Sequence, residues 1–223
     1  MCNRFALPKP EEIAAHFELG EVPALAPRYN VGPGESILVV RRDGPRRVLD
    51  TSAWGLLPRR DGKAKPVLNL RAESLRASAE RGGAASLRGR ALVPAGGFFE
   101  WRHVGRARQP WYFRLKDSPL LALAALADEP GAAPAAPPPR RCAVVTTTPN
   151  ELVAEVHDRM PVIIPREAYD AWLDPATRLA ELLPLLVPFP ADAMIGHPVS
   201  SLVNRSGVED PRAIEPARQE TLF

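Results

Sequence analysis

The chain has 223 residues, of which 45% are hydrophobic and 25% are charged, so it can bury a core and form one large domain or two small ones. No uninterrupted apolar run approaches the roughly 20 residues of a membrane-spanning helix, and the first ten residues lack the basic and apolar regions of a secretory signal. Only two cysteines occur, Cys2 and Cys142, too few for a disulfide scaffold. We therefore expect a folded, cytoplasmic protein that does not associate with membranes.

The net charge of +3 hides an uneven distribution of charge along the chain. Residues 1–115 carry 20 basic and 11 acidic side chains, whereas the remainder carries 9 basic and 15 acidic ones. Of the 29 basic residues 25 are arginine, and a biased genomic composition accounts for most such excesses. Guanidinium groups are also the usual partners of phosphate, so a fold that gathers the N-terminal arginines on one face would bind nucleic acid. Charge alone leaves both interpretations open.

Apolar spacing predicts the elements in chain order. Residues 10–19 form a short amphipathic helix behind a proline, and residues 36–42 and 46–50 form a hairpin around Asp43-Gly44-Pro45. A helix follows Asn69 over 70–80, and another follows Thr148, with Thr148 as its cap, Pro149 at its first position and Glu151 at its third. The remaining expected strands are 51–57, 90–101, 109–116, 119–126, 141–148 and 193–200, and the remaining helices are 165–173 and 178–186. An irregular tail follows Asn204.

A proline- and alanine-rich stretch at 128–141 lies between two expected strands. Because proline cannot donate to a strand ladder, we read this stretch as an exposed, mobile loop within one sheet and not as a domain boundary. The whole chain, 1–223, then forms a single α+β domain. Its core is a mainly antiparallel sheet, curled toward a barrel because the strands outnumber the helices that could cover them, with a few helices at the periphery.

Cys2 is the residue most informative about chemistry. Methionine aminopeptidase removes Met1 before a small side chain, which would leave cysteine first, with a free amine beside its thiol. Both groups of this 1,2-aminothiol are nucleophilic near neutral pH, because their reference pKa values are about 8 and about 8.5. Taken alone, a cysteine at position 2 is more often chance than function.

Three further residues are candidates for acid–base work, each with an ordinary structural alternative. Glu100 follows Phe98 and Phe99, so partial desolvation would raise its pKa and suit it to proton transfer; otherwise it is a solvent-facing acid at a strand end. His157 either carries protons near neutral pH or is an ordinary surface histidine. Asn69 lies between a strand and a helix, where N-capping explains it as well as catalysis does.

Metal and cofactor sites are not expected. The four histidines are not spaced for a shared face, and neither cysteine has a CxxC partner. The glycine-containing segments GPGES and GGFFEW match neither a dinucleotide loop nor a P-loop.

Taken together, the segments resemble the SOS response-associated peptidase (SRAP) family, and the resemblance covers nearly the whole chain. The first matching segment is Met1-Cys2-Asn3-Arg4-Phe5. With this resemblance, function becomes the better explanation of Cys2 than chance. The later segments in family order are RYNVGPG at 28–34, WGLLP at 54–58, NLRAES at 69–74, GFFEW at 97–101, HDRMPVII at 157–164 and HPVS at 197–200.

The resemblance implies an enzyme that recognises abasic sites in single-stranded DNA and captures them covalently, in the setting of DNA damage and SOS repair. The amine of Cys2 would form a Schiff base with the ring-opened sugar, and the thiol would close a thiazolidine. By the same resemblance, Glu100 moves protons, His157 lies near the sugar hydroxyl, and Asn69 orients the N-terminus. No cofactor is implied, and we expect a nucleoid-associated monomer.

The resemblance also implies a DNA path. Arg4, Arg71 and Arg159 match residues that hold flanking phosphates, and Pro33 and Trp101 match its lining. Two positions depart from the family pattern. Asn3 stands where many members have glycine, and Arg59-Arg60 follow WGLLP where many members carry an aromatic wedge. These two arginines are expected to stack on a base or grip phosphate, and a preference for DNA junctions is left open.

Two other functions remain as alternatives. The chain could be a thiol peptidase that cleaves other proteins, or a non-enzymatic module that binds single-stranded DNA through its arginine-rich front half. Incubation with abasic DNA separates the three. A denaturation-resistant adduct indicates capture, protein cleavage without an adduct indicates a peptidase, and the binding module gives neither.

Overall fold

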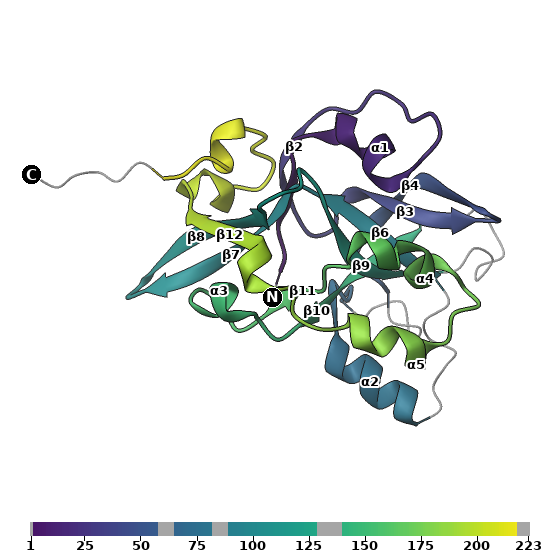
Figure 1. Cartoon of the computed structure of the whole chain (residues 1–223). Helices are drawn as coiled ribbons and strands as arrows, with labels where there is room; N and C mark the ends of the chain where they lie inside the picture. Colours follow the sequence, from purple (N-terminus) through teal and green to yellow (C-terminus); the bar gives the residue numbers. More distant parts are fainter. Residues whose placement is uncertain (1, 58–64, 82–88, 129–139, 218–223) are drawn as a thin grey trace, which may run out of the picture.

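The fold is built on two β-sheets that share a core (Figure 1). The computed structural model describes residues 2–57, 65–81, 89–128 and 140–217. The first sheet is antiparallel throughout and has the strand order β12-β8-β7-β1-β2. Its strands are β1 (Phe5–Leu7), β2 (Arg28–Val31), β7 (Gly97–Val104), β8 (Ala107–Leu115) and β12 (Met194–Pro198).

The second sheet is mixed and strongly curled. Its pairings run from β10 through β4, β3, β6 and β9 and return to β10. Only Val40 and Leu92 pair between β3 and β6, so in the described residues the ring is not a continuously bonded barrel. The strands are β3 (Ser36–Asp43), β4 (Arg46–Trp54), β5 (Asn69–Arg71), β6 (Gly89–Ala95), β9 (Leu121–Ala127), β10 (Arg141–Thr147) and β11 (Met160–Pro161). The α+β class and the curled sheet expected from the sequence are thus confirmed.

The α-helices of the described residues are short. Most lie around the second sheet, whereas the third contacts β12 and lies beside the first sheet (Figure 1). None of them is long and apolar enough to cross a membrane. A 3-10 turn at Pro10–Glu12 leads into the first helix, and another at Leu183–Leu185 follows the last helix. The helices are α1 (Ile13–Phe17), α2 (Ala72–Glu80), α3 (Glu151–Ala154), α4 (Tyr169–Leu173) and α5 (Leu179–Leu182).

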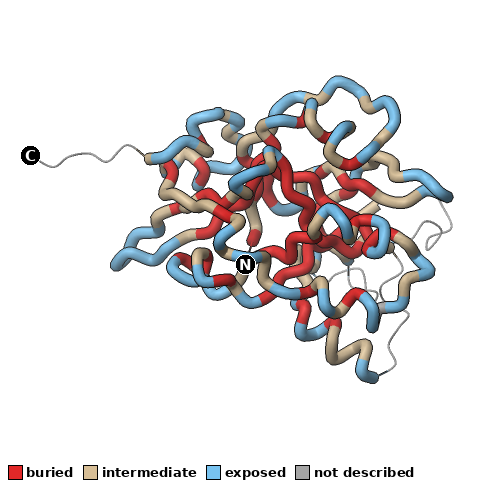
Figure 2. The backbone as a smooth tube through the Cα atoms, viewed as in Figure 1, coloured by how far each residue is buried: buried red, intermediate tan, exposed pale blue. Residues whose placement is uncertain are grey.

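Strand alternation divides the buried side chains between two main cores, because successive residues of a strand point to opposite faces. In β6, Ala91 and Val93 face a core that also contains Cys2, whereas Leu92 faces a second core covered by α1, α4 and α5. Figure 2 shows the buried segments gathered in the middle of the molecule, where strands of both sheets converge. Cys2 therefore belongs to the core between the sheets.

The run 90–101, expected as one strand, is two strands in different sheets. The chain leaves β6 at Ala95 and enters β7 at Gly97. At Gly96 an added Cβ would lie 2.4 Å from Pro8 Cδ, and at Gly97 it would lie 2.4 Å from the carbonyl oxygen of Phe113. Only glycine permits backbones to approach this closely, so the glycine pair is where the chain crosses between sheets.

Two expectations about helix starts are wrong. The helix after Thr148 begins at Glu151, and its cap is Asn150, whose Oδ1 accepts a hydrogen bond from the Val153 amide at 2.9 Å. Asparagine caps as well as threonine does, so the sequence pattern could not choose between them. Asn69 does not cap α2, because it lies in β5, two residues before the capping position, and the helix itself begins at Ala72.

The expected strands 46–50 and 51–57 are one continuous strand, β4, and the other expected elements are present with small changes of boundary. The hairpin turns at Gly44, which has a φ of +57°. Of the loop expected at 128–141, residues 129–139 lie outside the described residues, but the strands it joins do pair, with Ala127 opposite Cys142. The tail after Asn204 is irregular apart from a 3-10 turn at Pro211–Ala213.

Candidate functional site

Cys2 lies three residues before the start of β1 and is fully buried. β1 is an inner strand of the first sheet, held between β2 and β7, so the start of the chain is fixed by pairing on both sides. The Cys2 thiol faces the carbonyl oxygen of Arg4 at 4.0 Å. Burial raises the pKa of this thiol, and the nearby Glu100 carboxylate raises it further. The thiol is therefore neutral at physiological pH.

Glu100 lies inside β7, at the last buried position of the strand. Phe98 belongs to the core that contains Cys2, and Glu100, two residues later, points to the same face. Its side chain is 2% exposed, and burial raises its pKa to about 8. The desolvation expected for this acid is confirmed, although the residue lies within the strand and not at its end. Near neutral pH both its protonated and its ionised forms are populated.

His157 follows α3 and turns its ring toward Glu100. The backbone amide of Arg159 donates to His157 Nδ1 at 3.0 Å, so the neutral ring carries its proton on Nε2. Nε2 lies 3.7 Å from Glu100 Oε2, a distance suited to an electrostatic interaction and longer than a hydrogen bond. Burial lowers the pKa of His157, which favours the neutral ring at physiological pH. The structure thus brings the acid and the imidazole together.

Asn69 reaches the same region from β5. Its amide nitrogen donates to Asn3 Oδ1 at 2.8 Å, which ties β5 to the residue beside Cys2. Its Oδ1 is buried and has no hydrogen-bond partner among the described residues. A buried acceptor without a donor costs free energy, so this oxygen is available to a donor that arrives later. Asn3, which the sequence marked only as a departure from the family pattern, is therefore part of the site.

Arg4 and Arg71 differ in how firmly they are held. Arg4 donates to Asn30 Oδ1 at 2.8 Å and to the Ser206 hydroxyl at 3.3 Å. Asn30 is fully buried and also donates to the carbonyl oxygen of Arg205 at 2.6 Å. Arg71 ends β5 with its side chain exposed. Arg71 is thus open to solvent, whereas Arg4 is positioned by the buried Asn30 and by the exposed Ser206.

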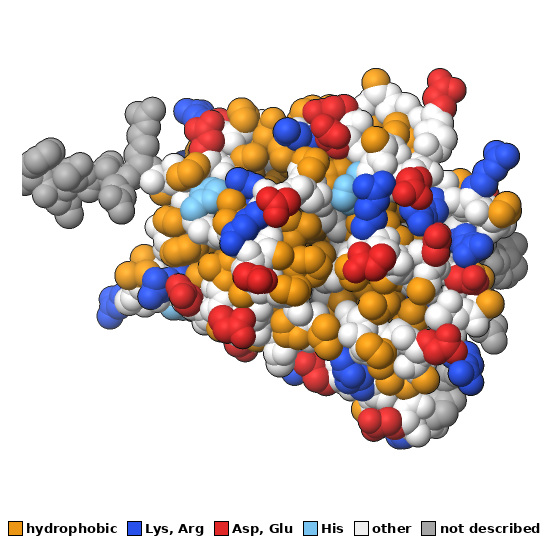
Figure 3. Space-filling model, in the orientation of Figure 1, with side chains coloured by type: hydrophobic (Ala, Val, Ile, Leu, Met, Phe, Trp, Pro, Cys, Tyr) orange, Lys and Arg blue, Asp and Glu red, His pale blue; other side chains and the backbone are white. Residues whose placement is uncertain are grey.

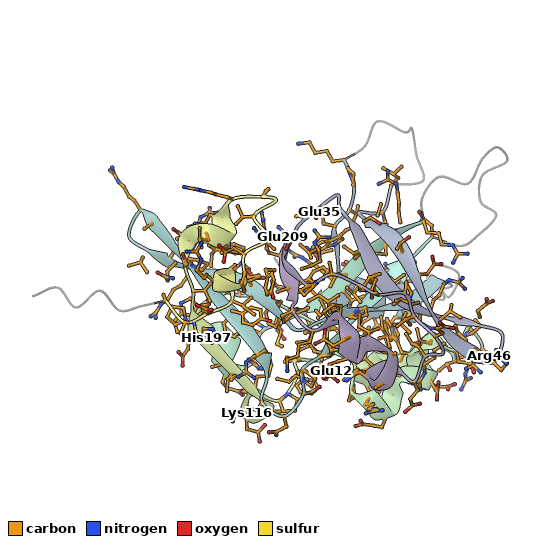
Figure 4. All side chains as sticks on the ribbon, turned by 90° about the horizontal axis from the view of Figure 1, so that it is seen from above. Glu12, Glu35, Arg46, Lys116, His197 and Glu209 are labelled. Atoms are coloured by element: carbon orange, nitrogen blue, oxygen red, sulfur yellow. The ribbon has the colours of Figure 1, made fainter. Side chains whose placement is uncertain are left out.

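The C-terminal segment that holds Arg4 is itself fixed to β2. Glu209 accepts from Arg28 Nε at 2.6 Å, and Glu35 also pairs with Arg28 from the turn after β2. Figure 4 labels both acids and shows them close together beside β2. This network keeps residues 205–209 next to β2, the strand that contains Asn30.

The other residues expected on a DNA path are more scattered. Pro33 is exposed in the turn before β3, and Trp101 donates through Nε1 to Asn204 Oδ1 at 2.7 Å. The Arg159 side chain is only 11% exposed, because its guanidinium group forms a two-pronged pair with Glu73. Met1, Arg59 and Arg60 lie outside the described residues.

The face of the molecule drawn in Figure 3 carries no single basic patch. On the face shown in Figure 3, basic and acidic side chains alternate around a central apolar region. Among the described residues, no three His, Cys, Asp or Glu side chains are grouped as metal ligands would be.

Sequence reasoning missed three residues that hold the site: Asn3, Asn30 and Glu73. Each lies inside a motif that the sequence did single out, MCNRF, RYNVGPG and NLRAES. Motif membership was therefore the available signal, but their partners lie 66, 26 and 86 residues away in sequence. Only the fold brings such pairs together.

The fold and the site define an α+β protein that sets an acid and an imidazole against the first residues of its own chain. The family model described as SOS response associated peptidase (SRAP) matches residues 1–206. The chain therefore belongs to the SRAP family.

Several curated proteins are similar over most of this chain. The abasic site processing protein YoqW of Bacillus subtilis is 36% identical, with 96% of this chain and 99% of that protein covered. The abasic site processing protein YedK of Escherichia coli is 27% identical, with 97% and 100% covered. The abasic site processing protein HMCES of Gallus gallus is 29% identical over 85% of this chain and 66% of that protein.

Two solved structures support the fold. A phage-related protein of Bordetella bronchiseptica is 30% identical and has a TM-score of 0.71, with 89% of this chain and 94% of that chain covered. A protein of Bacteroides thetaiotaomicron has a TM-score of 0.78, with 97% and 98% covered, at 23% identity, and shows the fold alone.

Proposed function

We propose that this protein processes abasic sites in DNA by capturing them covalently on Cys2 in single-stranded DNA, after removal of Met1. The observation that carries the proposal is a buried carboxyl group, Glu100, with a pKa of about 8, in the core that Cys2 shares, in a chain of the SRAP family. The relatives named above as abasic site processing proteins support the same substrate.

The capture follows from the chemistry of a 1,2-aminothiol. The amine attacks the aldehyde carbon of the ring-opened sugar and forms a carbinolamine, which loses water to give an imine. The thiol then adds across the imine, its sulfur bonding to carbon and its proton passing to nitrogen. The product is a five-membered thiazolidine, and one water leaves overall. The saturated carbon makes this product slower to hydrolyse than the imine.

The acid–base groups suit these steps. Loss of water from the carbinolamine needs a proton donor, and addition of a neutral thiol needs a proton acceptor. Glu100 can supply both near neutral pH, because its pKa of about 8 keeps both forms populated. His157 directs its Nε2 proton toward Glu100. In this proposal it assists proton transfer to the sugar hydroxyl.

The raised pKa of Cys2 favours capture over the peptidase alternative. A thiol peptidase attacks as a thiolate, which needs a lowered pKa and a partner such as an imidazolium. Burial and Glu100 act in the opposite direction on Cys2. Capture begins with the amine, so it does not require a preformed thiolate.

Incubation with abasic single-stranded DNA, followed by a denaturing gel and intact-mass measurement, tests the proposal. Wild type is expected to lose Met1 and form a denaturation-resistant adduct whose mass is the sum of protein and DNA less one water. Cys2→Ala should form no stable adduct, and Cys2→Ser only a labile product, while both retain much of the DNA affinity that phosphate contacts provide.

Cys142→Ala is the matched control, because it removes a second buried thiol from the same core and leaves the N-terminus intact. It should form the adduct as wild type does. A stable adduct in Cys2→Ala would contradict the mechanism. Cleavage of a protein substrate without an adduct would instead support the peptidase.

A further inference from the structure

Glu73 lies in the first turn of α2 and is half exposed, yet it is connected to the candidate site. Its two carboxylate oxygens accept from Arg159 Nη1 at 2.8 Å and Nη2 at 3.0 Å. Such a two-pronged pair fixes orientation as well as distance. The hydrogen bonds from Arg159 hold the pKa of Glu73 below its ordinary value, which keeps the carboxylate charged.

Arg159 is anchored on a second side by β10. Its Nη2 donates to the carbonyl oxygen of Thr146 at 2.7 Å. The side chain is 11% exposed, so most of its surface is enclosed by these partners. A guanidinium group held this way has little freedom to turn toward a phosphate, and its position fixes the backbone of the segment that carries it.

That backbone is what holds His157. The Arg159 amide donates to His157 Nδ1 at 3.0 Å, which sets the proton of the neutral ring on Nε2, facing Glu100. We infer that Glu73 is a positioning residue for the reaction: through Arg159 it holds the 157–159 segment so that His157 keeps its Nε2 proton directed at Glu100. This inference rests on the proposed function for its catalytic consequence but not for the geometry.

The charges that face His157 would otherwise favour a different tautomer of its ring. Asp158 Oδ1 lies 3.1 Å from Nδ1, where it would favour a proton on that nitrogen, and Glu100 faces Nε2 from β7. Besides burial, electrostatic interaction with the N-terminal amine and, to a smaller extent, with His103 on β7 lowers the pKa of His157. The Arg159 amide competes directly with Asp158 for Nδ1, so loosening the segment shifts the balance toward the other tautomer.

Imidazole ¹⁵N NMR of the DNA-free protein tests the positioning role. Wild type should show a protonated Nε2 and an accepting Nδ1, with a His157 pKa below the ordinary value. Glu73→Gln should show mixed tautomers and a pKa closer to that value. Arg159→Gln should give the same changes, and it serves as the second variant. An unchanged tautomer and pKa in both variants would overturn the inference.

Single-turnover capture of abasic single-stranded DNA tests the consequence. Glu73→Gln should slow adduct formation several-fold to about tenfold, the range expected for the net contribution of one ordinary hydrogen bond, and should alter the pH profile. Glu73→Asp, which keeps a carboxylate, should recover part of the rate. In a His157→Ala background Glu73→Gln should add no further loss, because both act through the same ring.

Glu80→Gln is the matched control, since Glu80 is an exposed acid at the other end of α2. It should leave rate, pH profile and tautomer as in wild type. An additive loss in the His157→Ala background would overturn the inference. If wild type forms no adduct, the proposed function fails, whereas the NMR result still decides the role of Glu73.

Discussion

The chemistry of Glu100 depends on its position in the fold, which sets both its burial and its neighbour. The sequence identified it as an acid among aromatic residues, which predicts desolvation, and the structure buries it almost completely. What the sequence could not provide is its companion. Glu100 and His157 are brought within 3.7 Å by strand pairing and by the Arg159 amide, and neither follows from spacing along the chain.

The raised pKa of Glu100 has a consequence for stability. The unfolded chain ionises this carboxyl near 4.5, whereas the folded protein holds its proton up to about pH 8. Between these values the folded state binds more protons, so the group's contribution is full below pH 4.5 and is lost as pH rises toward 8. Glu100→Gln should remove this loss.

Urea unfolding at pH 5 and pH 8 measures the effect. The free energy of unfolding of wild type relative to Glu100→Gln should fall as pH rises, by up to several kcal/mol. Each unit of difference between the folded and unfolded pKa values is worth about 1.4 kcal/mol. Glu80→Gln, at an exposed position, should follow wild type at both pH values. A wild-type advantage that grows with pH would contradict the assignment.

At the scale of elements, periodicity located most strands and helices but not the sheet each belongs to. The hairpin of β3 and β4 was predictable because a turn residue lies between two alternating runs. The run 90–101 is continuous in hydrophobicity, so alternation could not reveal that it passes from one sheet to the other. The glycine pair at 96–97 is the local signal of that crossing.

Gly97→Ala tests the close approach at this crossing. The added Cβ would meet the Phe113 carbonyl oxygen at 2.4 Å and the Tyr112 ring at 2.5 Å, both in β8. The substitution should destabilise the fold by about 1–3 kcal/mol, as overpacking typically does. Gly20→Ala, where nothing lies within 4 Å, is the control and should change stability little. Equal urea midpoints for the two variants would contradict the assignment of Gly97.

At the scale of the whole molecule, ion pairs between the two halves of the chain occupy part of its arginines. Bases of the front half pair with acids of the back half: Arg28 with Glu209 at 2.6 Å, Arg42 with Asp174 at 3.2 Å and Arg47 with Asp170 at 2.9 Å. Composition could not show this, because it counts charges without their partners. We therefore expect DNA binding to depend on which arginines remain accessible, and not on their total number.

Arg71 is such an arginine, exposed at the end of β5, two residues from Asn69. If it holds a phosphate beside the captured sugar, Arg71→Ala should weaken binding to single strands of any sequence. It should also reduce the slope of log affinity against log salt by about one, while adduct formation by bound DNA is unchanged. Fluorescence anisotropy over a salt series measures the slope.

Arg46 provides the matched control, because it is exposed at the tip of the β3–β4 hairpin, labelled in Figure 4. Trp54, which shares the core with Cys2, lies eight positions further along the same extended strand, a span of about 26 Å. Beyond a Debye length of about 10 Å its charge is largely screened from the site, so Arg46→Ala should keep the wild-type slope. Equal slopes in both variants would mean that the phosphates pass elsewhere on the surface. A loss in Arg71→Ala alone places the DNA path along the exposed end of β5.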